Sequence, residues 1–389
     1  RFMSNREALR AVVMAFCGGG LAVGSLRGPR ASTGDGPSVS PGSAGSGFTT
    51  GRLRWRVTSA FGTHLPNLGE NPIEVADRLR VATGGRIDWT IDDPGEVVPA
   101  FAIVEAVRAG KIEAGYTWLG YDEGRRAASV LFGAVPFGMT PWEYSAWWVK
   151  GGGRELAHEI YHPLGIEPIL CGLIGPETAG WFRHEIENPE DIEGLKIRFA
   201  GLGGRALQKL GAAVTMLPGG EIFQALEKGA IDATEFSLPE VDARLGFDRV
   251  ARFNYFPGWH QPHTAFHLVV HGPTWAAQND ATRAAIELAC EAGVHQNLAV
   301  AEARQGKAIA QFQARGVVTK TLSPSLLSAF ERAVNEVLDE EAEADADFAR
   351  ILEHQRAFRA DYALWRALAY PETASSPETA SSPKSANAP

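Results

Sequence analysis

Apolar residues change spacing repeatedly along the middle of the chain, which indicates alternating strands and helices. Short apolar runs at 53–60 and 86–91 have the length of strands. The segments 71–85 and 97–110 instead place apolar residues at helical spacing and end in glycine. A further short strand follows the second of these helices. Repeated strand–helix–strand units predict an α/β protein with mostly parallel sheets.

Two distant segments share one local pattern. EAVRAGKIEAGY (105–116) and QALEKGAIDATE (224–235) each join a helix, a glycine and a short strand, and in this register Tyr116 takes the place of Glu235. Such units are common in any α/β protein. The alternative is a protein of two lobes that use the same unit to aim a residue at a shared cleft, beyond the carboxyl ends of the strands.

The two ends of the chain differ from its middle. Two arginines precede an apolar stretch at 11–26, so we expect residues 1–27 to be a secretory signal and the protein to be periplasmic. Residues 28–51 and 371–389 are rich in small and polar residues, which predicts a flexible linker and a disordered tail.

Two long helices are predicted near the C-terminus. The first, 324–344, is amphipathic, and an acidic stretch separates it from the second, 345–370. The second helix carries a one-sided, aromatic-rich stripe that must be covered by its own chain or by another subunit. The pattern of the sequence leaves open which of the two covers this helix.

Composition excludes several classes of protein. The formal net charge is −9 and there is no long basic run, which argues against a nucleic-acid partner. Beyond the signal segment there are only Cys171 and Cys290, which allow one disulfide at most. No CxxC pair is present, so a zinc site built on cysteine is not expected.

GLGGRA (201–206) resembles a dinucleotide-binding fingerprint between a strand and a helix. The fingerprint needs an acidic residue at the end of the next strand, where this chain has Pro218. We interpret this helix N-terminus as structural, or as an aid in holding a small anion.

Several polar residues stand in apolar surroundings. Arg198 lies on an apolar strand, either in an internal ion pair or as a clamp for a ligand carboxylate. Glu235 ends a strand, and Glu177 and Gln261 lie among aromatic residues. A lone histidine such as His260 is interpreted as an ordinary surface or core residue.

Together KIRFAGLGG, GAIDATE, PGWHQP, and PFGMT with the aromatic run after it resemble the solute-binding proteins of tripartite ATP-independent periplasmic (TRAP) transporters, closest to the branch that binds 2-oxo acids such as pyruvate, or lactate. The resemblance covers about 53–370. It implies a two-lobed fold of the periplasmic-binding-protein, type II-like class, with a cleft between the lobes and a long C-terminal helix. Because this branch includes dimers that exchange that helix, it also implies that 345–370 is the dimerisation helix of a homodimer. The expected lobes are 52–172 with about 262–300, and 173–261 with about 301–344.

The resemblance also implies a binding site. Arg198 would bind the ligand carboxylate, and a cation would be held by Glu177, Glu235, Gln261 and the backbone carbonyl of Phe236. The branch usually has Gln and Glu where this chain has Glu177 and Gln261, as if the two ligands had exchanged identities. The expected aromatic and apolar walls of the pocket are Tyr116, Trp118, Trp259 and Phe236.

The cation has a physical reason. Glu177, Glu235 and a bound acid would bring three negative charges together against the one positive charge of Arg198. Oxygen ligands favour a hard cation, Ca²⁺ or Na⁺, and two carboxylates favour Ca²⁺. Without a metal, the two carboxylates would instead favour a cationic ligand.

We therefore expect a receptor, and no enzyme, that binds a small 2-oxo or 2-hydroxy monocarboxylate for the membrane subunits of a TRAP transporter. One alternative is a secreted metal-dependent hydrolase whose cation activates water. Against it, we expect no nucleophile motif and no His-rich ligand set. Another is a receptor of the same fold that feeds a sensor.

Overall fold

The computed structural model describes residues 51–369. The predicted signal segment, nearly all of the predicted linker and the predicted tail lie outside this range. Within it, no helix combines the length and the apolar character that crossing a membrane requires.

The first sheet has five strands in the order β2-β1-β3-β10-β4. β1 pairs in parallel with β2 and β3, whereas β10 is antiparallel to both of its neighbours. The strands are β1 Leu53–Ser59, β2 Ile87–Asp92, β3 Ala114–Trp118, β4 Ile166–Ile174 and β10 Thr264–His271.

The second sheet has six strands in the order β11-β9-β5-β8-β6-β7. β6 pairs in parallel with β7 and β8, β11 is parallel to β9, and β5 is antiparallel to β8 and β9. Both sheets are therefore mixed, within the predicted α/β class. The strands are β5 Gly180–Phe182, β6 Lys196–Arg198, β7 Ala213–Thr215, β8 Ala233–Thr234, β9 Phe253–Phe256 and β11 Val318–Thr321.

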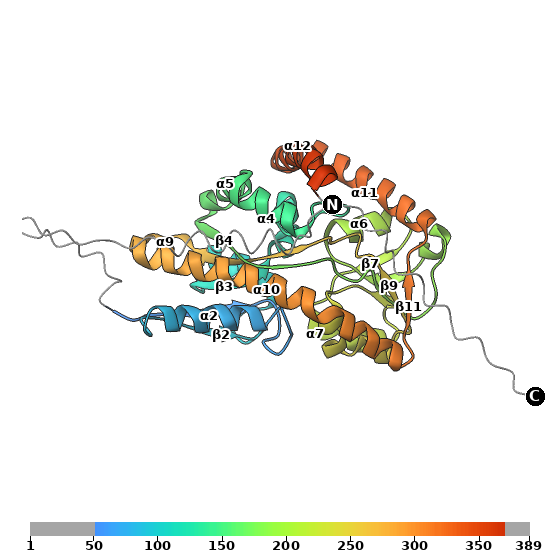
Figure 1. Cartoon of the computed structure of the whole chain (residues 1–389), viewed down its shortest axis with the longest axis horizontal. Helices are drawn as coiled ribbons and strands as arrows, with labels where there is room; N and C mark the ends of the chain where they lie inside the picture. The colour runs from blue at the N-terminus through green and yellow to red at the C-terminus, as the bar shows by residue number, and fades with distance from the viewer. Residues whose placement is uncertain (1–50, 370–389) are drawn as a thin grey trace, which may run out of the picture. The chain divides into compact units, whose positions relative to one another are not determined.

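Helices pack on both sheets, and one of them contacts elements of each (Figure 1). α10 has 35 residues and so a length of about 52 Å. It packs on strand β4 of the first sheet and on strand β11 of the second, and it also contacts helices α2 and α8. The helices are α2 Glu70–Ala82, α3 Ile103–Arg108, α4 Pro141–Lys150, α5 Gly153–Tyr161, α6 Gly201–Lys209, α7 Gly219–Glu227, α8 Pro239–Leu245, α9 Gly272–Ala276, α10 Asp280–Ala314, α11 Pro324–Ala344 and α12 Ala346–Ala369.

The chain moves between the two sheets along three connections. It leaves the first sheet between β4 and β5, returns between β9 and β10, and crosses again through α10. The first two connections, 175–179 and 257–263, contain Glu177 and Gln261. The predicted lobe boundary near 300 falls inside α10, so the division into lobes stays a prediction.

The two segments of shared pattern have the same backbone conformation. Gly110 and Gly229 adopt left-handed φ angles of 67° and 72°, a conformation that glycine takes without strain. After each glycine, the next residue's N–H returns to the preceding helix, in the pairs Lys111–Ala106 and Ala230–Ala225. The unit then leads into β3 in one sheet and β8 in the other, both of which have neighbours on each side.

The C-terminal helices begin and end close to the predicted positions. α11 ends at Ala344 and α12 begins at Ala346. The first half of α12 is covered by its own chain, because Phe348, Ile351 and Leu352 are buried. Its last turns are not: Leu364, Trp365 and Leu368 are 69%, 61% and 78% exposed.

Candidate functional site

A small cavity lies where residues of the two sheets meet. Its volume is about 20 Å³, roughly the space of a single water molecule. Most of the predicted binding residues contribute to its wall. The lining consists of Phe61, Leu68, Trp118, Tyr121, Glu177, Arg198, Ala200, Glu235, Phe236, Ser237, Gln261, Thr264 and Phe266.

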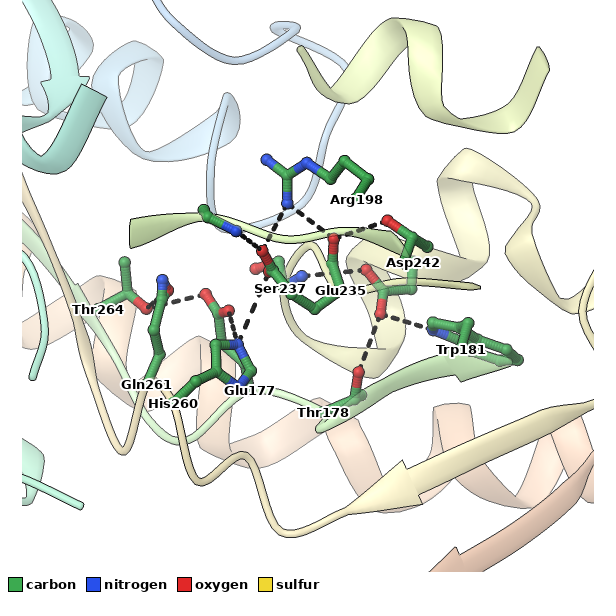
Figure 2. Close-up of polar contacts among 12 residues, drawn as sticks. Glu177, Thr178, Trp181, Arg198, Glu235, Ser237, Asp242, His260, Gln261 and Thr264 are labelled. Atoms are coloured by element: carbon green, nitrogen blue, oxygen red, sulfur yellow. Dashed lines mark hydrogen bonds and ion pairs between the residues drawn. The ribbon is translucent and has the colours of Figure 1, made fainter. Parts of the chain in front are cut away.

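Arg198, the last residue of β6, is fully buried and held by its own chain (Figure 2). Its Nη1 donates to the Oε1 and to the backbone carbonyl of Glu235, both at 2.7 Å. Its Nε donates to the carbonyl of Leu217 at 3.1 Å. None of these bonds uses Nη2. The guanidinium is thus part of an internal ion pair and also forms part of the cavity wall, so the two interpretations of Arg198 do not exclude each other.

Glu235 follows β8 and binds the N-terminus of α6. Its Oε1 accepts from the backbone N–H of Ala200 at 2.6 Å. Burial alone would raise the pKa of Glu235, but Arg198 and the neighbouring donors outweigh it and lower that pKa. The GLGGRA segment therefore begins a helix whose positive end meets a carboxylate of the same chain, in agreement with the structural interpretation.

Glu177 lies in the connection between β4 and β5. Its Oε1 accepts from the hydroxyl of Thr264 at 2.8 Å, and its backbone N–H donates to the carbonyl of Gln261 at 3.2 Å. The Thr264 hydroxyl also lies 3.3 Å from the Oε1 of Gln261. Burial, its largest influence, raises the pKa of Glu177. Thr264, which begins β10, thus joins two predicted cation ligands, although the sequence did not point to it.

His260 is the largest difference from the site predicted from sequence. It is 2% exposed, and its Nε2 lies 3.5 Å from Glu177 Oε2 and 3.7 Å from Glu235 Oε2. Burial alone would lower the pKa of His260, but the two carboxylates raise it to about 9. His260 is therefore no ordinary core histidine, and it adds a second positive charge. The signal in the sequence that could have placed His260 at the site is its position directly before Gln261, a predicted cation ligand.

Two carboxylate oxygens in the cluster lack a hydrogen-bond partner. Glu177 Oε2 and Glu235 Oε2 are buried without one among the described residues. Together with His260 Nε2 they form a group whose ligand atoms lie within 4.8 Å of one another. Buried charged oxygens need a donor or a cation. The residues present therefore fit a bound cation, with Gln261 and Phe236 in the same wall.

The predicted aromatic walls divide into two groups. Trp118 lines the cavity, whereas Tyr116 and Trp259 are absent from its lining. Tyr116 lies on the same face of β3 as Trp118, but it is covered by Phe61 and Phe266, with ring centroids at 6.3 and 5.9 Å.

Trp259 packs in a separate aromatic group, against Phe199 and Phe330. Phe61 and Tyr121 line the cavity instead, and the sequence analysis did not identify them. The roles of all these residues as ligand contacts stay predictions.

A buried carboxyl group outside the cavity lining connects the segments that carry the two glutamates. Asp242 accepts from the indole of Trp181 at 2.8 Å, the hydroxyl of Thr178 at 3.4 Å and the backbone N–H of Ser237 at 3.2 Å. Burial raises the pKa of Asp242 well above its usual value. Because Thr178 follows Glu177 and Ser237 lies two residues after Glu235, Asp242 positions both segments.

The expectation that no His-rich ligand set exists is wrong. Residues 158–162 read HEIYH, and His158 and His162 form a group of potential metal ligands with Glu167. The HExxH spacing of this segment is the signal for the cluster in the sequence.

The thiols of Cys171 and Cys290 are both buried and free. Burial, followed by the neighbouring Cys171 thiol, raises the pKa of Cys290 well above its usual value. The raised pKa keeps the thiol of Cys290 protonated and unreactive.

Two sheets joined by crossing segments, with buried charged residues where they meet, define a two-lobed ligand-binding receptor. Residues 69–345 match the family described as bacterial extracellular solute-binding protein, family 7 (DctP), and the chain belongs to this family. The resemblance noted in the sequence is thereby confirmed.

Relatives of known sequence or structure are similar over most of the chain. A monocarboxylate 2-oxoacid-binding periplasmic protein of Nostoc sp. is 34% identical over 83% of this chain and 90% of its own length. A TRAP transporter solute-binding protein from Bordetella bronchiseptica, a dimer with copurified calcium and picolinate in its active site, is 31% identical with a TM-score of 0.80, over 82% of this chain and 95% of its own.

A TRAP periplasmic solute-binding protein from Pseudoalteromonas atlantica, with bound sodium and pyruvate, is 30% identical with a TM-score of 0.78, over 82% of this chain and 97% of its own. The predicted periplasmic-binding fold is thus confirmed. The protein is an extracytoplasmic solute receptor of the TRAP class.

Proposed function

We propose that this receptor binds a small 2-oxo or 2-hydroxy monocarboxylate through Arg198 and a bridging cation, and that it catalyses no reaction. Glu177, Glu235, Gln261 and the carbonyl of Phe236 hold the cation, Ca²⁺ or Na⁺. The receptor delivers its ligand to the membrane subunits of a TRAP transporter.

The observation that carries this proposal is a pair of buried carboxylate oxygens that accept no hydrogen bond, on two residues that line the same cavity as Arg198. Glu177 Oε2 and Glu235 Oε2 are buried and accept no hydrogen bond in the described structure, although His260 Nε2 lies 3.5 and 3.7 Å from them. Both residues line the cavity with Arg198. A cation between them satisfies both oxygens and offsets the charge of an incoming acid. The calcium and sodium bound by the relatives from Bordetella and Pseudoalteromonas support this assignment.

The size of the cavity bears on how the ligand enters. A volume of about 20 Å³ holds about one water molecule, which is less than a three-carbon acid needs. Binding therefore requires the walls contributed by the two sheets to move apart and then close around the acid. In such receptors ligand contacts stabilise the closed arrangement.

We further propose that two copies of the chain associate through the end of α12. Leu364, Trp365 and Leu368 are exposed there, and α12 packs on α4, whose Trp142 and Val149 are 65% and 54% exposed. Exposed apolar residues gathered on neighbouring helices mark an interaction surface. The relative from Bordetella bronchiseptica is a dimer.

Thermal unfolding of the chelator-stripped full chain tests the ligand site. We expect pyruvate or lactate to raise the melting temperature only when Ca²⁺ or Na⁺ is present. Ligand at about 100 times its Kd stabilises the native state by about 2.7 kcal/mol, which is readily measured. Glu235→Gln removes a cation ligand and abolishes the cation-dependent shift, and Arg198→Lys weakens it.

Asp232→Asn is the matched control, because Asp232 lies three residues before Glu235 but pairs with Lys196 outside the cavity. It leaves the shift unchanged. If an acid raises the melting temperature without any cation, the metal is removed from the proposal but the carboxylate receptor is kept. A shift with amines and none with acids shows that the two glutamates bind a cationic ligand instead.

A further inference from the structure

A second cluster of metal-ligand side chains lies beside the first sheet. His158 is in α5, His162 begins the 3₁₀ segment His162–Leu164 one turn later, and Glu167 is in β4. Their ligand atoms lie within 4.8 Å of one another. None of the three lines the cavity around Arg198, so this cluster is separate from the proposed carboxylate site.

Both imidazoles face one carboxylate. His158 Nε2 lies 2.9 Å from Glu167 Oε1, and His162 Nε2 lies 2.9 Å from Glu167 Oε2. The two rings stack with their centroids 4.3 Å apart. Zinc binds nitrogen and oxygen at about 2.0–2.2 Å, which separates tetrahedral donors by about 3.4 Å. Each imidazole–carboxylate pair would therefore separate by about half an ångström to reach the spacing of donors around an ion.

The backbone holds this arrangement in place. Residues one turn apart on a helix project from the same side, which brings His158 and His162 together. The core side of α5 is anchored by buried Leu156, Ala157 and Tyr161, and the helix packs on β4, which supplies Glu167. The donors are thus preorganised on two packed elements.

The chemistry of the donors selects the metal. Two imidazoles and one carboxylate suit Zn²⁺ and similar transition metals, whereas Ca²⁺ and Na⁺ prefer oxygen ligands alone.

Two cationic side chains lie near the cluster without occupying its carboxylate. Lys150 and Arg154 line a cavity of about 430 Å³ together with His158 and Glu167. Neither forms an ion pair with Glu167, whose side chain is 12% exposed and has both oxygens facing imidazole.

The HEIYH segment has the spacing of zinc hydrolases, in which the glutamate is the general base. Here Glu159 is outside the donor cluster. Its carboxylate pairs with Arg350 of α12, and its side chain is 57% exposed. The geometry therefore provides metal ligands without a base directed at the metal.

We propose that His158, His162 and Glu167 bind one Zn²⁺ ion in a site independent of the carboxylate site. Three protein ligands leave a coordination position for water or a further group. Glu159 lies outside the donor set and pairs with Arg350, so the function proposed for this site is metal binding.

Titration calorimetry of Zn²⁺ into the tag-free, chelator-stripped full chain at neutral pH tests this site. We expect saturable binding that the double variant His158→Asn, His162→Asn loses. Glu167→Gln weakens binding by at least about tenfold, since even residues behind the ligands cost 10–100-fold in affinity. Co²⁺ added to the same proteins gives visible absorption bands of a low-coordinate site only where the histidines are present.

The controls separate this site from its surroundings and from the carboxylate site. His295→Asn changes a histidine that lines the same cavity outside the cluster, and Glu159→Gln changes the residue between the histidines; both retain Zn²⁺ binding. Glu235→Gln also retains it, while the double histidine variant keeps its cation-dependent response to pyruvate. Absent binding by the wild-type chain, or equal binding by a folded double variant, overturns the proposal.

Discussion

At the scale of single residues, the charges at the site are nearly balanced before any ligand arrives. Glu177 and Glu235 face Arg198 and His260, and all four are buried. The sequence placed three of these four, because an acid or an arginine in an apolar strand is conspicuous. It did not place His260, since an imidazole suits many environments and only the fold brings it between two carboxylates.

Replacement of His260 tests this balance. His260→Asn removes a positive charge beside both glutamates, which at about 4 Å is worth several kcal/mol even in a polarisable interior. We expect the chelator-treated variant to melt at a lower temperature than the wild type and to bind Ca²⁺ at least about tenfold more tightly. Thermal unfolding with increasing Ca²⁺ measures both effects.

His263→Asn is the matched control, because His263 is buried nearby but burial lowers its pKa to about 4, so that it is neutral. It leaves the affinity for Ca²⁺ unchanged. Weaker binding of Ca²⁺ by His260→Asn would show that the imidazole is itself a cation ligand.

At the scale of elements, the pattern of the sequence predicted strands and helices well where one face of an element is buried. The helix 324–344 coincides with α11, and β1 lies within the predicted strand 53–60. The central strand β8 has only two residues, too few for a periodic signal, and its place in the sheet comes from long-range pairing. The sequence could not predict that Phe266 covers Tyr116 for the same reason, because Phe266 comes from β10, far along the chain.

β10 also contains a titratable group that makes stability depend on pH. His267 is fully buried against Trp148, and burial lowers its pKa from 6.5 to about 3. As pH falls below 6.5 the unfolded chain binds a proton that the native state excludes, so stability decreases. The contribution of this one group is a loss of about 2 kcal/mol at about pH 5.

Urea unfolding at neutral and mildly acidic pH measures this dependence. We expect His267→Gln to lose less stability than the wild type as pH falls. His184→Gln, a change at an exposed histidine, leaves the dependence unaltered. Parallel pH profiles for His267→Gln and the wild type would contradict the prediction.

At the scale of the whole molecule, the sequence identified the stripe on the C-terminal helix but could not say how much of it is covered. The structure shows that Phe348, Ile351 and Leu352 are buried by the chain itself, while the apolar residues of the last turns remain exposed. The chain itself thus covers the first half of α12, and cover by a second subunit stays a prediction for the second half.

The exposed apolar residues in the second half of α12 predict the oligomeric state of the protein in solution. We expect the full chain to sediment as a homodimer, with a melting temperature that rises with protein concentration. Trp365→Glu combined with Leu368→Glu places charges in the apolar surface and produces a monomer. Leu288→Glu, at a leucine that is 64% exposed elsewhere, leaves the dimer intact. A wild-type monomer at all concentrations would refute the assignment.

The connections between the sheets give the site a mechanical property. Glu177 and Gln261 lie on the two short segments through which the chain passes from one sheet to the other, and these segments are hydrogen-bonded together. We expect any rotation between the two halves to be centred near these segments and near α10, the third connection. A rotation of a few degrees there would alter the spacing of the proposed cation ligands slightly and would displace residues far from the connections much more. We expect the proposed ion to fix the spacing of its ligands at these connections, and so to favour one arrangement of the surfaces that lie far from them.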